Sequence, residues 1–103
     1  MNEKYLPIGT VVLLKDGNKK VMIISYLIFT NGETKKMFDY GGCTFPEGVI
    51  ESDYAVGFNH DDIAEVIHLG LQDDEQKDFI ETLLAAEDEI KKKVETDIFN
   101  NPE

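Results

Sequence analysis

Cys43, the only cysteine of the chain, is the first side chain to consider for nucleophilic chemistry. It lies in the glycine-rich stretch DYGGCTFPEG, residues 39–48. A nucleophilic cysteine needs a base or a cation nearby to lower its pKa. The two histidines, His60 and His68, lie downstream, and the sequence around Cys43 matches no known nucleophile signature. We therefore predict a small, partly buried thiol at the end of a strand, and no catalytic residue.

The stretch FNHDD, residues 58–62, places one histidine beside two carboxylates, a combination that metal sites use. One histidine with adjacent aspartates falls short of the ligand set of a structural zinc site. The stretch also lacks the spacing of a calcium loop. We predict that Asn59 or Asp61 caps a short turn and that His68 is a partly buried histidine in an apolar strand. We expect no metal and no cofactor.

The charge of the chain excludes several classes of partner. Ten basic residues, all lysine, stand against twenty-one acidic ones, which gives a formal net charge of −11. Such a field repels phosphate backbones and anionic lipid, so we expect neither nucleic acid nor a membrane surface as a partner. The stretch YGGC lacks the spacing and the lysine of a phosphate-binding loop. Paired carboxylates on an exposed helix are not a hydrolase site, so we expect no enzyme activity.

Aromatic residues around the Pro-Glu-Gly corner are the side chains best suited to bind a protein. Aromatic groups beside glycine and proline on a rigid corner are typical of interface hot spots. Core packing is the alternative role and the one expected for most of them, while some could line a groove on the rim of a barrel. The candidates for partner binding are Tyr40, Phe45, Pro46, Glu47, Tyr54 and Phe58.

Apolar runs rich in β-branched residues predict an antiparallel sheet in the first two thirds of the chain. The runs on either side of Asp16-Gly17 predict a hairpin, and Asn31-Gly32 predicts a second turn before another strand. After this third strand, Gly41-Gly42 relaxes the limits on the backbone and Pro46-Glu47-Gly48 predicts a tight turn.

Residues 62–69 are ambiguous between strand and helix, and the alternation of apolar residues from Ile63 to Leu69 slightly favours a strand. Residues 11–14 and 21–24 are apolar on both faces. The sheet must therefore be covered, either by curling into a barrel or by a packed helix.

From Asp73 the apolar residues recur at three- and four-residue steps, which predicts an amphipathic helix over residues 73–97. Asp73 with Gln76 resembles a capping box. Residues 98–103 are expected to be a frayed tail. Ile90 and Val94, if they extend beyond the sheet, could pair two helices in a homodimer.

Together these patterns predict an α+β fold: a small bent antiparallel sheet or an SH3-like barrel of four or five strands, with a C-terminal amphipathic helix. We expect one domain over residues 1–103, with a β-rich body over 5–71. No signal peptide or membrane-spanning segment is readable, and a lone cysteine suits a reducing compartment. These features favour a cytoplasmic protein.

Four stretches of the chain resemble a small bacterial family of unknown function. They are YLPIGTVVLLK, MIISY, DYGGCTFPEG and FNHDDIAEVIHLG, and the resemblance covers about residues 5–71. Members are encoded in Gram-positive bacteria near type VII secretion systems and their LXG-type toxins. The resemblance implies an accessory role, such as a chaperone or targeting partner for a secreted toxin, and brings no catalytic residues. The matching positions are Tyr40, Gly42, Pro46, Glu47, Gly48, Phe58 and Asp62.

The favoured function is therefore the binding of a protein partner, such as a secretion substrate, through the aromatic corner or the acidic helix face. An immunity protein that neutralises a toxin domain is the alternative. A small cysteine-dependent enzyme is the hypothesis from another class.

Overall fold

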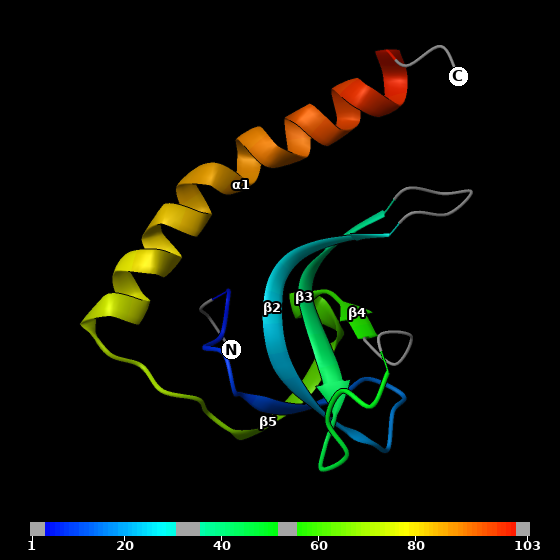
Figure 1. Ribbon diagram of the computed structural model, residues 1–103, viewed down its shortest axis with the longest axis vertical. Coiled ribbons are helices and arrows are strands. Elements are labelled where there is room, and N and C mark those ends of the chain that lie inside the picture. Colours follow the sequence, from blue (N-terminus) through cyan, green and yellow to red (C-terminus); the bar gives the residue numbers. More distant parts are fainter. Residues whose placement is uncertain (1–3, 31–35, 52–55, 101–103) are drawn as a thin grey trace.

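The computed structural model describes residues 4–30, 36–51 and 56–100, with backbone only at 29, 30, 36 and 91–100. An antiparallel sheet has the strand order β4-β3-β2-β1-β5, and a long helix follows it (Figure 1). The sheet is open, so of the two predicted forms the bent sheet is present and the barrel is not. The α+β prediction is confirmed. The elements are β1 (Val11–Leu14), β2 (Lys20–Thr30), β3 (Lys36–Thr44), β4 (Val56–Phe58), the 3-10 turn η2 (His60–Asp62), β5 (Ile63–His68) and α1 (Asp74–Asn100).

The hairpin between β1 and β2 turns at Asp16-Gly17, as predicted. Asp16 adopts a φ of 64°, and the Gly17 amide donates to the Leu14 carbonyl over 3.0 Å. Aspartate and glycine tolerate this left-handed backbone better than other residues do. The second predicted turn, at Asn31-Gly32, lies outside the described residues.

The chain turns at Pro46-Glu47-Gly48, as predicted, with the Gly48 amide donating to the Thr44 carbonyl over 2.8 Å, whereas Gly41 and Gly42 are strand residues. Both lie inside β3, and their neighbours across β2 leave no room for a side chain. A Cβ on Gly42 would meet the Met22 carbonyl oxygen at 2.7 Å, and one on Gly41 would meet Ser25 Oγ at 2.2 Å. A register shift in β2 lies opposite these glycines, where β2 and β3 bend together (Figure 1). The glycines thus allow close approach of two strands rather than a turn.

The edge strand β5 pairs with β1 and ends where the chain turns toward α1. Of the two forms left open for this stretch, the strand is present, with Ile63 buried and His68 exposed. Beyond it, the Gly70 amide donates to Thr10 Oγ1 over 3.0 Å. A Cβ on Gly70 would approach the Ile8 carbonyl oxygen to 2.3 Å. This contact fixes the linker, residues 69–73, against the N-terminal segment, residues 4–10, and so sets where α1 begins.

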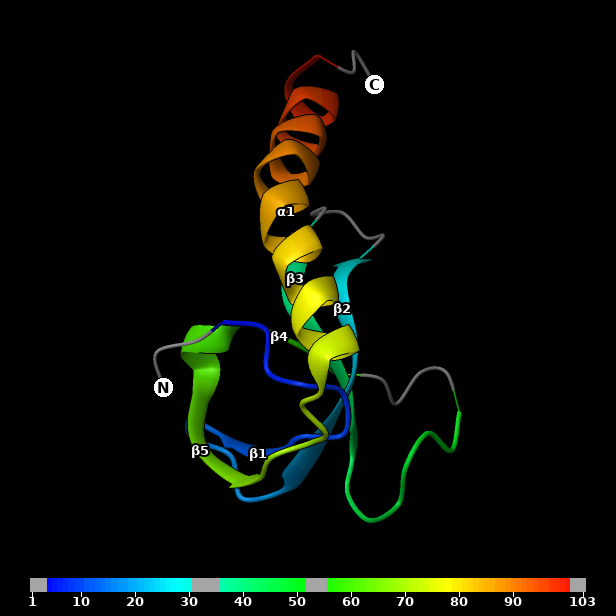
Figure 2. The ribbon, with the colours of Figure 1, turned by 90° about the vertical axis from the view of Figure 1, so that its left-hand side faces the viewer.

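Helix α1 is capped as predicted: the Asp73 carboxylate accepts from the Gln76 amide over 2.8 Å. The helix continues to Asn100, past its predicted end at residue 97, and residues 101–103 lie outside the described part. The N-terminal segment lies between the first half of α1 and β2, while the second half of α1 extends away from the sheet (Figures 1 and 2). Of the helix side chains, Leu83 joins the core and Ile80 packs against it.

Candidate functional site

Cys43 is buried near the end of β3, at the predicted place in the strand but more deeply than the partly buried thiol that we predicted. In the strand register it lies opposite Met22. A nucleophile must be reached by its substrate, so a buried thiol is poorly placed for covalent chemistry.

His60 is held in a hydrogen-bond network rather than presented to solvent. Its Nδ1 lies 2.8 Å from the Tyr40 hydroxyl, and its backbone amide donates to the Asp39 carboxylate over 2.9 Å. Burial lowers the pKa of His60 below its ordinary value, so the ring is neutral near pH 7. His68, by contrast, is exposed, so the prediction that it is partly buried is wrong.

The FNHDD stretch caps a turn, as predicted. The Asp62 carboxylate accepts from the Asn59 amide over 2.8 Å, and the Asn59 side chain accepts from the Asp39 amide over 3.0 Å. These hydrogen bonds engage the side-chain oxygens of Asn59 and Asp62, which are the atoms in this turn that could bind a metal. Within the described ranges, no three His, Cys, Asp or Glu side chains are grouped closely enough to hold a metal ion.

Two tyrosine hydroxyls fix the N-terminal segment through hydrogen bonds to the backbone amide and carbonyl of Leu6. The Tyr40 hydroxyl accepts from the Leu6 amide over 3.0 Å, and the Tyr26 hydroxyl donates to the Leu6 carbonyl. The Tyr5 ring packs edge-on against both rings, with centroids 5.7 and 6.1 Å away. Burial raises the pKa of Tyr26 to about 12. The cluster is thus neutral at any ordinary pH and serves to fix the chain.

The predicted partner-binding residues are divided between the core and the surface. Tyr40 and Phe58 are fully enclosed and stack with ring centroids 5.3 Å apart. Their role in this structure is therefore the core packing that we named as the alternative. Tyr54 lies outside the described residues.

Phe45, Pro46 and Glu47 are exposed at the corner after β3. Lys20 Nζ lies 5.2 Å from the Phe45 ring centroid, and Lys19 pairs with Glu47 over 2.8 Å. Lys19 and Lys20, at the end of the β1–β2 hairpin, thus cover part of the predicted binding corner. It remains an accessible surface, but these residues line neither of the two cavities described below.

The cavities lie on either side of the first turns of α1. The first, which we call the β2 groove, has a volume of about 620 Å³ and is open to solvent. Its apolar side chains are Ile8, Ile24, Leu71 and Phe79, which are 47, 36, 75 and 52 % exposed. The remaining lining residues are Ser25, Tyr26, Asp73, Glu75 and Gln76.

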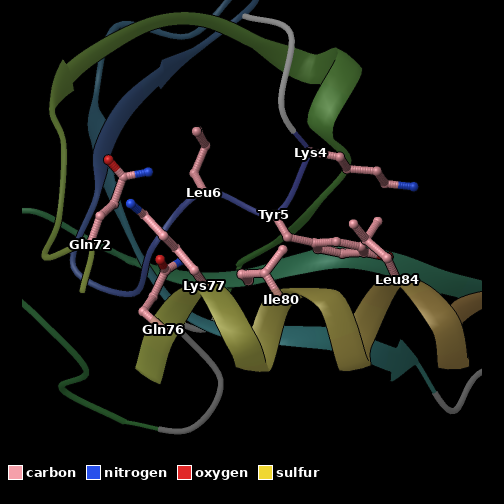
Figure 3. Close-up of a pocket in the computed structure, with 8 residues that line it drawn as sticks. All are labelled: Lys4, Tyr5, Leu6, Gln72, Gln76, Lys77, Ile80 and Leu84. Atoms are coloured by element: carbon pink, nitrogen blue, oxygen red, sulfur yellow. The ribbon is translucent and has the colours of Figure 1, made fainter. Parts of the chain in front are cut away.

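The second cavity, the N-terminal pocket, has a volume of about 520 Å³. Figure 3 shows Tyr5 beside Ile80 and Leu84 of α1, while Lys4 extends along the helix. Lys4 pairs with Asp39 over 3.2 Å and with Glu87 of the helix. Although burial opposes it, hydrogen bonds to Glu87 and Asp39 raise the pKa of Lys4. A charged lysine therefore joins the N-terminal segment, the sheet and α1.

Acidic side chains dominate the helix that borders both cavities. Residues 73–90 contain eight acids and one lysine. Ile90, one of the predicted dimer contacts, is half-buried, and the side chain of Val94 lies outside the described part. The dimer therefore stays a prediction.

Sequence reasoning missed the β2 groove because its apolar residues come from four separate segments. Ile8 precedes β1, Ile24 lies on β2, Leu71 lies on the linker and Phe79 lies on α1. One signal could have indicated it. Phe79 and Ile80 are adjacent large apolar residues at the start of the helix, and a single face can bury only one of them fully.

Comparisons with known proteins identify a family but no characterised relative. No curated protein and no solved structure matches the chain significantly. Across the residues that the structure describes, no helix has the length and apolar character needed to cross a membrane. Residues 5–79 match the domain of unknown function DUF4176, a range that includes every residue lining the β2 groove. Because this match spans most of the sequence, the chain belongs to the DUF4176 family.

Proposed function

We propose that the protein is a non-enzymatic module that binds a protein partner through the β2 groove. One observation carries this proposal: four large apolar side chains remain exposed around a single groove. Exposed apolar side chains gathered in a concave site are typical of interaction surfaces. In a monomer alone in water, these side chains gain little from their position.

The surroundings of the reactive side chains support binding over catalysis. Cys43 is enclosed in the sheet, and His60 uses one ring nitrogen to bond the buried Tyr40. Neither residue lines the β2 groove or the N-terminal pocket. The partner surface and the potentially reactive groups are therefore in different places.

The family resemblance supplies a context for the partner. We propose a cytoplasmic chaperone or targeting partner for a toxin exported by a type VII secretion system. The test is co-expression with an LXG-type toxin encoded beside the protein, followed by affinity purification and size-exclusion chromatography. A chaperone or targeting partner should form a stable complex with the N-terminal helical part of the toxin. Absence of any complex with toxin fragments that together cover its full length would contradict the proposal.

An immunity protein is the second candidate, and the acidic surface of α1 favours it. Acidic inhibitors steer and neutralise basic toxin domains through charge complementarity. The two functions differ in the region bound. An immunity protein should bind the toxic C-terminal domain and suppress its toxicity when both are expressed in the same cell.

A further inference from the structure

We propose that the β2 groove binds one amphipathic helix of the partner, with its apolar face in the groove and lysine or arginine residues toward α1. This inference rests on the proposed function and deepens it, because it names the structural class of the bound segment. Its grounds are the apolar lining, the position of the groove in the sheet and the charge around it.

The apolar lining matches a helix with one hydrophobic stripe. Phe79 on α1 and Ile24 on β2 belong to different elements, with Ile8 and Leu71 completing the lining. A helix laid on the open side of the groove would contact residues of α1 and β2 from a single face. Helix-in-groove recognition uses such anchors, spaced at i, i+3, i+4 and i+7.

The position of the groove argues against an added strand. In the strand order, β4 and β5 are the edges of the sheet and β2 lies in its interior. A partner strand that extends the sheet needs an edge with free backbone groups. The β2 groove instead offers side chains from four segments, which is the surface that a packed helix needs.

The charges around the groove favour a bound helix that is positively charged. Asp73 and Glu75 line it, and Asp74 and Asp78 are exposed nearby on the same end of α1. Lys77 is the only basic residue in the acidic range 73–90. A second copy of this chain would bring a similar acidic helix against these carboxylates, which like-charge repulsion opposes. A basic helix is attracted to them.

The test measures binding of a fluorescein-labelled peptide with leucine and lysine on opposite faces of a helix, by fluorescence anisotropy at physiological salt. Two variants separate the groove from the general acidic field. Leu71→Asp adds a negative charge inside the groove, and Ile50→Asp adds the same charge at a side chain that is 66 % exposed outside it. If the groove binds the peptide, Leu71→Asp weakens binding about tenfold or more despite the added attraction, because an apolar anchor is lost. Ile50→Asp should leave binding unchanged or slightly stronger.

A second pair of variants tests the charge requirement. Glu75→Gln in the groove should weaken binding several-fold, whereas Glu81→Gln, at an exposed acid of α1 that does not line the groove, should have a smaller effect. A peptide with glutamate in place of lysine should not bind. Carbon-13 chemical shifts of the bound peptide should be helical.

Four results would overturn the inference: no binding of the Leu/Lys peptide, equal effects of Leu71→Asp and Ile50→Asp, a bound peptide in strand conformation, or a dimer of this chain whose formation covers Leu71. If a full-length toxin still co-purifies, the binding of a protein partner stands, but equal effects of Leu71→Asp and Ile50→Asp or a dimer that covers Leu71 would place its site outside the β2 groove. Conversely, helix binding without any toxin complex would retain the inference and contradict the chaperone proposal.

Discussion

The hydroxyl of Tyr40 lies 2.8 Å from Nδ1 of His60 and accepts a hydrogen bond from the Leu6 amide. With the ring proton on Nε2 the hydroxyl donates to Nδ1, and with the proton on Nδ1 the hydroxyl oxygen accepts from it, so both neutral tautomers keep this hydrogen bond. One buried tyrosine thus connects the N-terminal segment to the turn that leads into β5. The N-terminal segment in turn borders both cavities.

Replacing Tyr40 by phenylalanine should lower the free energy of unfolding by about 1–3 kcal/mol, because the buried Leu6 amide loses its acceptor. Urea denaturation followed by circular dichroism measures the change. Tyr26→Phe removes a hydroxyl that donates to the Leu6 carbonyl, which can be solvated when the sheet relaxes, and the expected loss is about 1 kcal/mol. A Tyr40→Phe protein as stable as the parent would show that the Leu6 amide finds another acceptor.

Stability should fall as the pH drops below the ordinary pKa of histidine, about 6.5. Burial lowers the pKa of His60 in the folded protein, so the unfolded chain binds its proton first. The stabilising contribution is complete above about pH 6.5 and is lost as the pH falls through the lower, folded pKa. Melting temperatures across this range should fall less steeply for His60→Gln than for the parent. An identical slope would assign the pH dependence to other groups.

Gly42→Ala should be strongly destabilising because the new Cβ meets a backbone oxygen at 2.7 Å, which a rotamer change cannot relieve. We expect a loss of about 1–3 kcal/mol, the range typical of overpacked sites. Gly48→Ala is the matched control: no described atom lies within 4 Å of its Cβ, but φ is +77°. This change should cost about 1–2 kcal/mol through backbone strain alone.

Amide hydrogen exchange can separate the two glycine variants further. Crowding between β2 and β3 should open the bent sheet, so amide exchange should rise across both strands in Gly42→Ala. In Gly48→Ala the increase should stay near the corner. If the two variants show the same exchange pattern, the close approach of β2 and β3 does not require the glycine.

Local signals in the sequence were sufficient for the elements whose causes are local. Asp16-Gly17 defines its hairpin and Asp73 its helix cap, because the interacting groups are within a few residues of each other. The role of Gly41 could not be inferred in this way. The group that excludes its Cβ, Ser25 Oγ, belongs to another strand and is known only once the register is known.

The candidate site depended on tertiary structure in the same way. The aromatic pattern singled out Tyr40 and Phe58 as partner-binding candidates, but both are buried, because one residue of difference in alternation decides which face of a strand is buried. The exposure of Leu71 and Phe79 depends on where α1 begins relative to the sheet, and the Thr10–Gly70 contact sets that position. No spacing rule within the helix contains this information.

Lys4→Gln should loosen α1 from the sheet without unfolding the sheet. The lysine contacts both Asp39 and Glu87, so its loss leaves two carboxylates near each other without the intervening cation. A partly exposed pair of this kind contributes about 1 kcal/mol or less. Hydrogen exchange should increase in residues 80–90 more than in β1 and β2, and added salt should reduce the difference. The same increase in all elements would indicate global destabilisation instead.

Iodoacetamide should label Cys43 more slowly in the folded protein than it labels a free thiol. The side chain is buried inside β3, so reaction requires local or global opening of the sheet. Labelling followed by mass spectrometry should accelerate strongly in denaturing urea. Gly42→Ala, which weakens the neighbouring strand contact, should also accelerate it, whereas Lys4→Gln should change it little. Rapid labelling of the folded parent near neutral pH would mean that the thiol is accessible and activated, and it would reopen the hypothesis of a cysteine-dependent enzyme.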